Sequence, residues 1–189
     1  MDVRTDRVGL LLEQLQASLD TSRDRLDGLT DEEYQWEPAP GAWSIRGRGQ
    51  SATCGAHGPG EWLLDGEIPE PRPAPATTIA WRIGRLAETF AGRWEWTFGP
   101  RSVRPDKVVD FSPSAARALD QLWFEVDRWI KEVDGLTDEQ LDTAGFGRYP
   151  WGWDSELPII TIVGLQNRQF IHHMAQVALL RDLWRLRGA

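Results

Sequence analysis

The amino-acid sequence predicts an all-α protein: a four-helix bundle with a long proline- and glycine-rich excursion between its first two helices. Apolar residues recur at three- and four-residue steps in four stretches, at about residues 5–26, 78–98, 112–133 and 159–187. This spacing lines one face of an α-helix. We find no credible strand between these stretches, so we expect a single domain over residues 1–189.

Short sequence signals mark the ends of the four predicted helices. Glycine and proline interrupt helices, whereas serine and threonine cap their first turns. The signals are Gly28 after the first helix, Thr77 or Thr78 before the second, Gly99 and Pro100 after it, Ser112 and Pro113 at the start of the third, and Pro158 and Gly188 around the last. Thr30, followed by Glu33 three residues later, predicts a capping box that opens a short turn.

Residues 37–76 form the excursion, which contains seven prolines and about as many glycines. This composition excludes long regular elements, and we expect only a short helix near residues 61–65. Trp43, Ile45 and Trp62 provide apolar anchors, so the excursion should be packed on the bundle. The chain carries 11 Trp, and such large rings line a core, a pocket or an interface. The segments 94–96 and 149–153 are the richest in them.

One internal similarity is visible, because residues 27–33 closely match residues 134–140. Each copy follows a long predicted helix and precedes an irregular stretch. Two interpretations stay open. The motif is either a good helix-stop, helix-start signal used twice, or the mark of two related helix pairs in a pseudo-twofold bundle.

Composition and charge exclude several classes of function. The net charge of −8 disfavours a nucleic-acid-binding protein, which needs a basic face. No apolar run approaches the roughly 20 residues that span a membrane, and the charged N-terminus does not resemble a signal peptide. One cysteine, Cys54, excludes an internal disulfide framework. These features predict a cytoplasmic protein without a nucleic-acid or membrane partner.

Two adjacent histidines lie in the middle of the last predicted helix. Successive residues of a helix differ by 100° in direction, so His172 and His173 cannot point the same way. His173 falls at the edge of the apolar face formed by Val163, Phe170 and other apolar residues, whereas His172 falls nearer the opposite side. At most one of them therefore points into a core or a site.

The sequence resembles the DinB-like superfamily, and most closely its mycothiol-dependent transferases and maleylpyruvate isomerase-like members. The motifs that carry the resemblance are Tyr34-Gln35-Trp36, Pro40-Gly41-Ala42-Trp43-Ser44-Ile45-Arg46, Thr77-Thr78-Ile79-Ala80-Trp81-Arg82, Asn167-Arg168-Gln169-Phe170-Ile171-His172-His173 and Leu179-Leu180-Arg181-Asp182-Leu183. The resemblance implies a down-up-up-down helix order. It also implies a divalent metal, held by one histidine on the second helix and two ligands four residues apart on the last.

Carried over to this chain, the three metal positions fall on Arg85, Gln169 and His173. Arginine stays protonated and cannot coordinate a cation. A neutral amide is a poor ligand for zinc or nickel, which prefer imidazole, thiolate or carboxylate. We therefore expect a degenerate site without a cofactor. If Zn or Ni does bind, His173 would hold it, with His172 as a weaker candidate.

The same positions suggest a binding site for a small molecule. We expect Arg85 to enter the vacated metal space, within hydrogen-bonding or water-bridged reach of Gln169 and His173, and to hold an anionic ligand. Its acidic partner would come from Glu88, Glu95 or the loop. Arg46, beside Arg48, is a further candidate for clamping a carboxylate, because guanidinium groups bind carboxylates with two parallel hydrogen bonds. The alternative for both loop arginines is solvated charge.

Cys54 and His57 are thiol- and metal-competent residues in the excursion, which could fold over the mouth of the bundle. Two classes of function remain. One is a binding protein for an anionic or thiol ligand, and the other is a metal-dependent S-transferase or isomerase that uses a low-molecular-weight thiol of the mycothiol type. A homodimer is compatible with either class.

Overall fold

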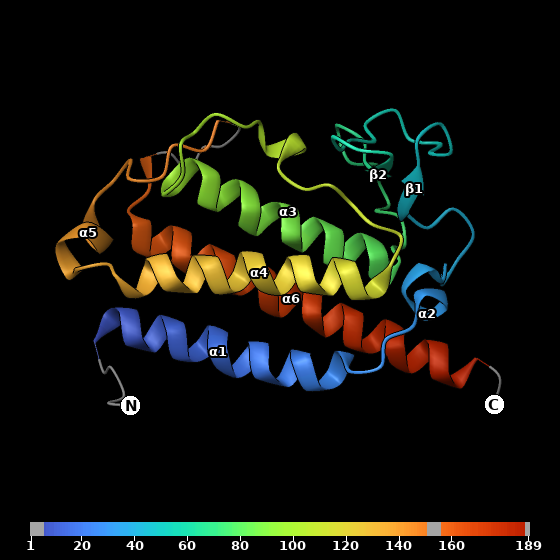
Figure 1. Ribbon diagram of the computed structural model, residues 1–189, viewed down its shortest axis with the longest axis horizontal. Helices are drawn as coiled ribbons and strands as arrows, with labels where there is room; N and C mark the ends of the chain where they lie inside the picture. The colour runs from blue at the N-terminus through green and yellow to red at the C-terminus, as the bar shows by residue number, and fades with distance from the viewer. Residues whose placement is uncertain (1–5, 151–155, 188–189) are drawn as a thin grey trace.

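The computed structural model describes residues 6–150 and 156–187, and four long helices dominate it. These are α1 (Arg7–Leu26), α3 (Ile79–Thr97), α4 (Ala115–Asp134) and α6 (Ile159–Leu186). In Figure 1, α1 and α6 run in one direction, and α3 and α4 run in the other. Helix α3 packs on α4 and α6, and α1 packs on α6 and α4. The predicted predominantly helical class is confirmed.

The observed helix ends lie close to the predicted ones. The carboxylate of Asp6 accepts a hydrogen bond from the backbone N–H of Gly9 at 2.9 Å and caps α1. Thr78, one of the two expected caps, accepts from the N–H of Trp81 at 3.0 Å and opens α3. Helix α4 begins slightly later than expected, after Ser114. None of the described helices is both long and apolar enough to cross a membrane.

The two copies of the internal motif form the short helices α2 (Asp31–Gln35) and α5 (Asp138–Asp142). In the second copy, Thr137 and Gln140 form a complete capping box. In the first copy, Thr30 accepts from the N–H of Glu33 at 3.2 Å, which is only half of the predicted box. The carboxylate of Glu33 points elsewhere, because it pairs with Arg181.

Two predictions about the excursion are wrong. It contains two short strands where none was expected, and residues 61–65 do not form the expected helix. Strands β1 (Ile45–Gly47) and β2 (Trp62–Leu64) pair antiparallel, with Ile45 opposite Leu64. Leu64 also pairs with His57 through two backbone hydrogen bonds. A five-residue helix would gain few backbone hydrogen bonds, whereas this pairing satisfies the backbone groups of β2 on both sides.

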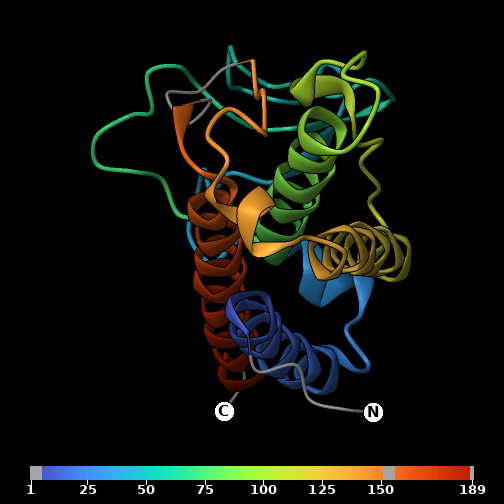
Figure 2. The ribbon, with the colours of Figure 1, turned by 90° about the vertical axis from the view of Figure 1, so that its left-hand side faces the viewer.

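The paired strands pack directly on α3, and a glycine makes the contact close. A Cβ atom at Gly84 would lie 2.9 Å from Ile45 Cδ1 and 3.2 Å from Leu64 Cδ1. Trp43 is buried, and its ring lies 5.9 Å from the ring of Trp81 on α3. Figures 1 and 2 show the excursion above one end of the long helices.

A second crossover, which contains the short 3-10 helix η1 (Pro105–Lys107), joins α3 to α4. The buried carboxylate of Glu95 accepts from the N–H groups of Ser102 and Val103 at 2.7 and 3.0 Å. Burial alone would raise the pKa of Glu95, but these hydrogen bonds outweigh it and lower the pKa. Of the tryptophans expected in segments 94–96 and 149–153, Trp151 and Trp153 lie outside the described residues.

A buried ion pair holds α6 against the junction of α1 and α2. Arg181, which is 2 % exposed, donates from Nε to Glu33 Oε1 at 2.9 Å. Its other nitrogens donate to the backbone carbonyls of Arg25 and Asp27. These carbonyls belong to the C-terminal end of α1, where the last carbonyl groups have no N–H donor within the helix. One guanidinium therefore caps α1 and neutralises Glu33.

We predict that Arg181→Met lowers the free energy of unfolding by about 3–5 kcal/mol, the usual cost of leaving one member of a buried ion pair alone. Denaturant titration measures this loss. Arg185→Met, on the exposed side of the same helix, is the control and should change stability by less than about 0.5 kcal/mol. A loss for Arg181→Met no larger than that of the control would contradict the assignment.

Candidate functional site

A cavity of about 250 Å³ lies between the excursion and α3. The excursion contributes two loop segments and the end of β2, and α3 contributes two side chains from its first half. Its walls combine aromatic, charged and small residues: Trp43, Gly55, His57, Leu64, Asp65, Gly66, Glu67, Ile68, Glu70, Trp81 and Arg85. The cavity is thus formed jointly by residues that are far apart in the sequence.

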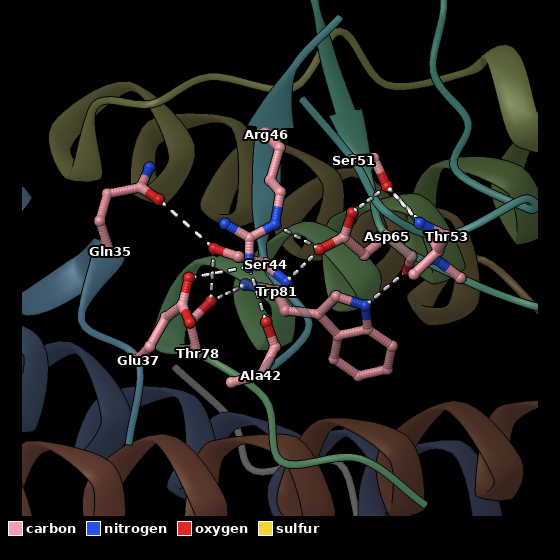
Figure 3. Close-up of polar contacts among 11 residues, drawn as sticks. Gln35, Glu37, Ala42, Ser44, Arg46, Ser51, Thr53, Asp65, Thr78 and Trp81 are labelled. Carbon is pink, nitrogen blue, oxygen red and sulfur yellow. Dashed lines mark hydrogen bonds and ion pairs between the residues drawn. The ribbon is translucent and has the colours of Figure 1, made fainter. Parts of the chain in front are cut away.

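The buried carboxylate of Asp65 holds the excursion in place above this cavity (Figure 3). Asp65 is 2 % exposed. It accepts hydrogen bonds from Ser44 N and Arg46 Nε, both at 2.9 Å, and from Ser51 Oγ at 2.5 Å. Its backbone carbonyl accepts from the indole N–H of Trp81 at 2.9 Å. These bonds tie three points of the excursion to one another and to α3.

Arg46, a candidate ligand-binding residue in the sequence, belongs to this network. Besides Asp65, its guanidinium donates to Glu37 Oε1 and to the carbonyl of Ala42, both at 2.8 Å. Burial alone would lower the pKa of Arg46, but the two carboxylates outweigh it and raise the pKa. In the structure Arg46 clamps two carboxylates of its own chain, and it is not among the residues that line the cavity.

A cluster of three charged side chains, His57, Glu88 and Arg85, lies on one side of the cavity. The carboxylate of Glu88 is buried, with one oxygen 2.6 Å from His57 Nε2 and the other 2.5 Å from an Arg85 terminal nitrogen. His57 Nδ1 lies 3.0 Å from the carbonyl of Gly55. A carbonyl can only accept, so Nδ1 carries a proton there. The predicted acidic partner of Arg85 is therefore Glu88.

The cluster favours a positively charged His57. Burial alone would lower the pKa of His57, and the charge of Arg85 acts in the same direction. The hydrogen bond and negative charge of Glu88, together with the carbonyl of Gly55, outweigh both effects and raise the pKa above its ordinary value. When His57 is protonated, one buried carboxylate lies between two cations.

Aromatic rings connect the cavity with α6. The rings of Trp81 and His173 are stacked with centroids 6.1 Å apart, and Trp81 in turn contacts Trp43. His173 is 6 % exposed, and its Nδ1 is buried without a hydrogen-bond partner among the described residues. His172 is exposed on the outside of the helix. The predicted division between an inward and an outward histidine is thus observed.

His173 is neutral in this environment. Burial is the main cause, and the nearby charge of Arg82, followed by those of His172 and Arg85, adds to it; together they lower the pKa of His173 to about 3. Arg82 stacks over the ring of Trp81 and donates to Thr77 Oγ1 at 2.7 Å. Its own pKa is lowered by burial.

In the structure the partner of Arg85 is Glu88, at 2.5 Å from an Arg85 terminal nitrogen; the expected approach of Arg85 to Gln169 and His173, directly or through water, stays a prediction. A carboxylate three residues further along the same helix is a stronger acceptor than a neutral imidazole or amide. Gln169 is half-buried on α6. The arginine whose charge acts most strongly on His173 is Arg82, which sequence reasoning did not single out.

The residues at the expected metal positions do not fit zinc or nickel. Arg85, Gln169 and His173 provide one cation, one amide and one imidazole, and only the imidazole is a good ligand. Within residues 6–150 and 156–187, no group of three His, Cys, Asp or Glu side chains is placed to hold a metal ion. His57 lines the cavity together with Trp81 and Arg85 of α3, whereas Cys54 is exposed.

Sequence reasoning also missed Asp65 and Trp81 as site residues. Asp65 carries no local signal, since its three donors lie 14 to 21 residues away. Trp81 stood in a recognised motif, but its stacking on His173 depends on how α3 and α6 pack.

We predict that the stability contributed by the His57–Glu88 pair depends on pH. Because the folded-state pKa of His57 is raised, the contribution is complete below about pH 6.5, the ordinary histidine value. It is lost as the pH rises through the folded-state value. The difference in unfolding free energy between wild type and His57→Gln should therefore shrink from mildly acidic to alkaline pH.

NMR titration of the His57 ring tests the cause directly. In Glu88→Gln the pKa of His57 should fall, because burial then acts without the opposing carboxylate. An unchanged titration in that variant would argue against the pair.

Comparison with known proteins agrees with the resemblance seen in the sequence. No curated protein and no solved structure matches the chain. The family model described as DinB superfamily matches residues 63–177. This segment runs from β2 through α3, α4 and most of α6, and it includes Arg85, Glu88, Gln169 and His173. The chain therefore belongs to the DinB superfamily.

Proposed function

We propose that this protein binds a small carboxylate-bearing molecule in the cavity beneath the excursion. Its four long helices then represent the down-up-up-down bundle implied by the family resemblance, with residues 37–76 as the excursion that closes its mouth. The single observation that carries the proposal is Arg85, whose half-exposed guanidinium lines the cavity and is held in place by Glu88.

Arg85 has the geometry of a ligand-binding group. Its side chain is 47 % exposed, and only one terminal nitrogen is used, in the bond to Glu88. The other guanidinium N–H groups have no partner among the described residues, so they can donate to a ligand carboxylate. Glu88 fixes the direction of the guanidinium, which reduces the entropy that binding costs. A protonated His57 adds a second positive charge on the same side.

The remaining walls set the shape and charge of the ligand. Trp43 and Trp81 line the cavity, and their rings offer aromatic surfaces that suit a flat apolar group of the ligand. Glu67 and Glu70 line the same cavity, and their negative charges disfavour a second anionic group at the ligand's other end. The ligand class that fits is an aromatic or apolar monocarboxylate whose far end is neutral or positively charged.

The metal-dependent thiol transferase or isomerase implied by the resemblance is the alternative. It requires three metal ligands, and the corresponding positions supply one. We therefore propose ligand binding without a resident metal. The single cysteine, Cys54, is free and exposed, which suits a reducing cytoplasm.

Calorimetric titration with benzoate and phenylacetate, each compared with its neutral amide, tests the binding proposal. We expect the carboxylates to bind and the amides to bind more weakly. Arg85→Gln should weaken carboxylate binding about 10- to 100-fold, because a hydrogen bond to a charged group contributes roughly 1.5–3 kcal/mol. Arg117→Gln, an exposed arginine on α4, should leave binding unchanged. Equal binding of acids and amides, or an unaffected Arg85→Gln, would overturn the proposal.

Elemental analysis of protein made without a histidine tag tests the metal. We expect no stoichiometric Zn or Ni, since Arg85 and Gln169 occupy two of the three ligand positions. About one equivalent of metal per chain, lost in His173→Ala, would show that the site still functions as a metal centre.

A further inference from the structure

Helix α6 is apolar on both sides, although only one side faces the core. Its inner side buries Phe170, Val177 and other apolar residues. Its outer side carries Ile171, Ala175, Leu179, Leu183 and Leu186, which follow one another at steps of four, four, four and three residues. Leu179 is 59 % exposed and Leu186 is 66 % exposed. A surface helix of a monomer usually has polar residues on its outer side, and a helix that is apolar all round is usually buried.

This outer row is about 22 Å long, because Ile171 and Leu186 are fifteen residues apart and an α-helix rises about 1.5 Å per residue. It accounts for four of the eight large apolar residues that are exposed among the described ones. A fifth, Leu10, lies on the neighbouring helix α1. Single exposed apolar residues are normal, but a continuous row of them marks an interaction surface.

A groove of about 410 Å³ runs beside the row, between α1 and α6. Small side chains form much of its lining, including Ala17, Ser18, Thr21, Ala175 and Ala178. The hydroxyl groups of Ser18 and Thr21 already donate to backbone carbonyls of α1 and do not depend on water as a partner. Ser18 Oγ donates to the carbonyl of Gln14, and Thr21 Oγ1 donates to that of Ala17, both at 2.9 Å. Covering this groove with apolar side chains therefore leaves no hydroxyl donor unsatisfied.

The row borders the groove, because Ile171 and Ala175 belong to both. Helices α1 and α6 pack on each other on the side of the molecule away from β1 and β2 (Figures 1 and 2). An isologous twofold interface uses the same surface on both copies, so that surface must be complementary to itself. An apolar row beside a groove with small side chains meets this requirement. From this arrangement we propose that the outer face of α6, with the α1–α6 groove, binds a second copy of this chain.

The charges select an antiparallel crossing centred on Ala175. In this arrangement Ile171 meets the partner's Leu179, and Arg168 meets the partner's Asp182, which already pairs with Arg25 across its own groove. A parallel arrangement would instead place each Arg168 beside its own copy. Ala175 is small enough to let the two helices approach closely at the axis.

The open backbone at Gly164 supports the same register. This residue lies on the outer side of α6, and a Cβ atom there would meet nothing within 4 Å. The antiparallel crossing places the partner's Leu186 over it. The Leu186 end of each row thus meets open space on the other copy.

Sedimentation equilibrium over a range of concentrations tests the proposal. We expect twice the chain mass of 21.4 kDa for the wild type and the single chain mass for Leu179→Glu. Phe124→Glu, an exposed apolar residue on α4, is the matched control and should stay dimeric. Because Leu179 is exposed on the single chain, its replacement should leave that chain folded, with the far-ultraviolet circular dichroism of the wild type and a cooperative thermal unfolding transition.

Oxidative cross-linking tests the register. In a Cys54→Ser background, Ala175→Cys should form a disulfide-linked dimer in high yield, whereas Phe124→Cys should not. A wild type that is monomeric at every concentration overturns the proposal, and so does a dimer that Leu179→Glu leaves intact. Binding of the wild type to lipid vesicles, lost in Leu179→Glu, would assign this face to a membrane surface instead.

Discussion

The buried carboxylate of Asp65 is the interaction on which the site depends. A buried charge is stable only when several donors replace the lost water, and here the donors come from Ser44, Arg46 and Ser51. The excursion needs such a centre because its prolines remove backbone donors and its only strands are three residues long. With Asp65 in place, β2 stays paired with β1 and His57 is held beside Glu88.

The buried pair of Arg181 and Glu33 fixes another irregular segment, the junction between α1 and α2. It also explains why the two copies of the internal motif differ. Both open with a threonine cap, but Gln140 completes its capping box, whereas Glu33 turns away to neutralise Arg181. The shared part of the motif is therefore local capping chemistry, and the differing part is set by what α6 brings alongside. The threonine cap that both copies share is compatible with both interpretations of the repeat.

What the sequence predicted, and what it did not, follows from the range of the interactions involved. The long helices, and the opposite directions of His172 and His173, depend on local periodicity, which can be counted along the chain. The pairing of Glu88 with Arg85 is also local, at three residues' spacing. Strand β2 was mistaken for a helix because its partner lies 17 residues away in an irregular segment. The distance between Arg85 and His173 depends on how α3 is rotated against α6, which no local pattern records.

The environment of His173, and with it the protonation state of its ring, depends on how α3 is rotated against α6. Its ring is stacked on Trp81, whose indole N–H is bound to the carbonyl of Asp65, so the excursion, α3 and α6 meet at one aromatic contact. Burial, followed by the charge of Arg82, lowers the pKa of His173 and favours its neutral form. The cluster of His57, Glu88 and Arg85 beside the cavity carries a net positive charge when His57 is protonated. At the cavity wall Arg85 is held in one direction by Glu88, and a guanidinium fixed in this way presents parallel N–H donors whose geometry matches that of a carboxylate.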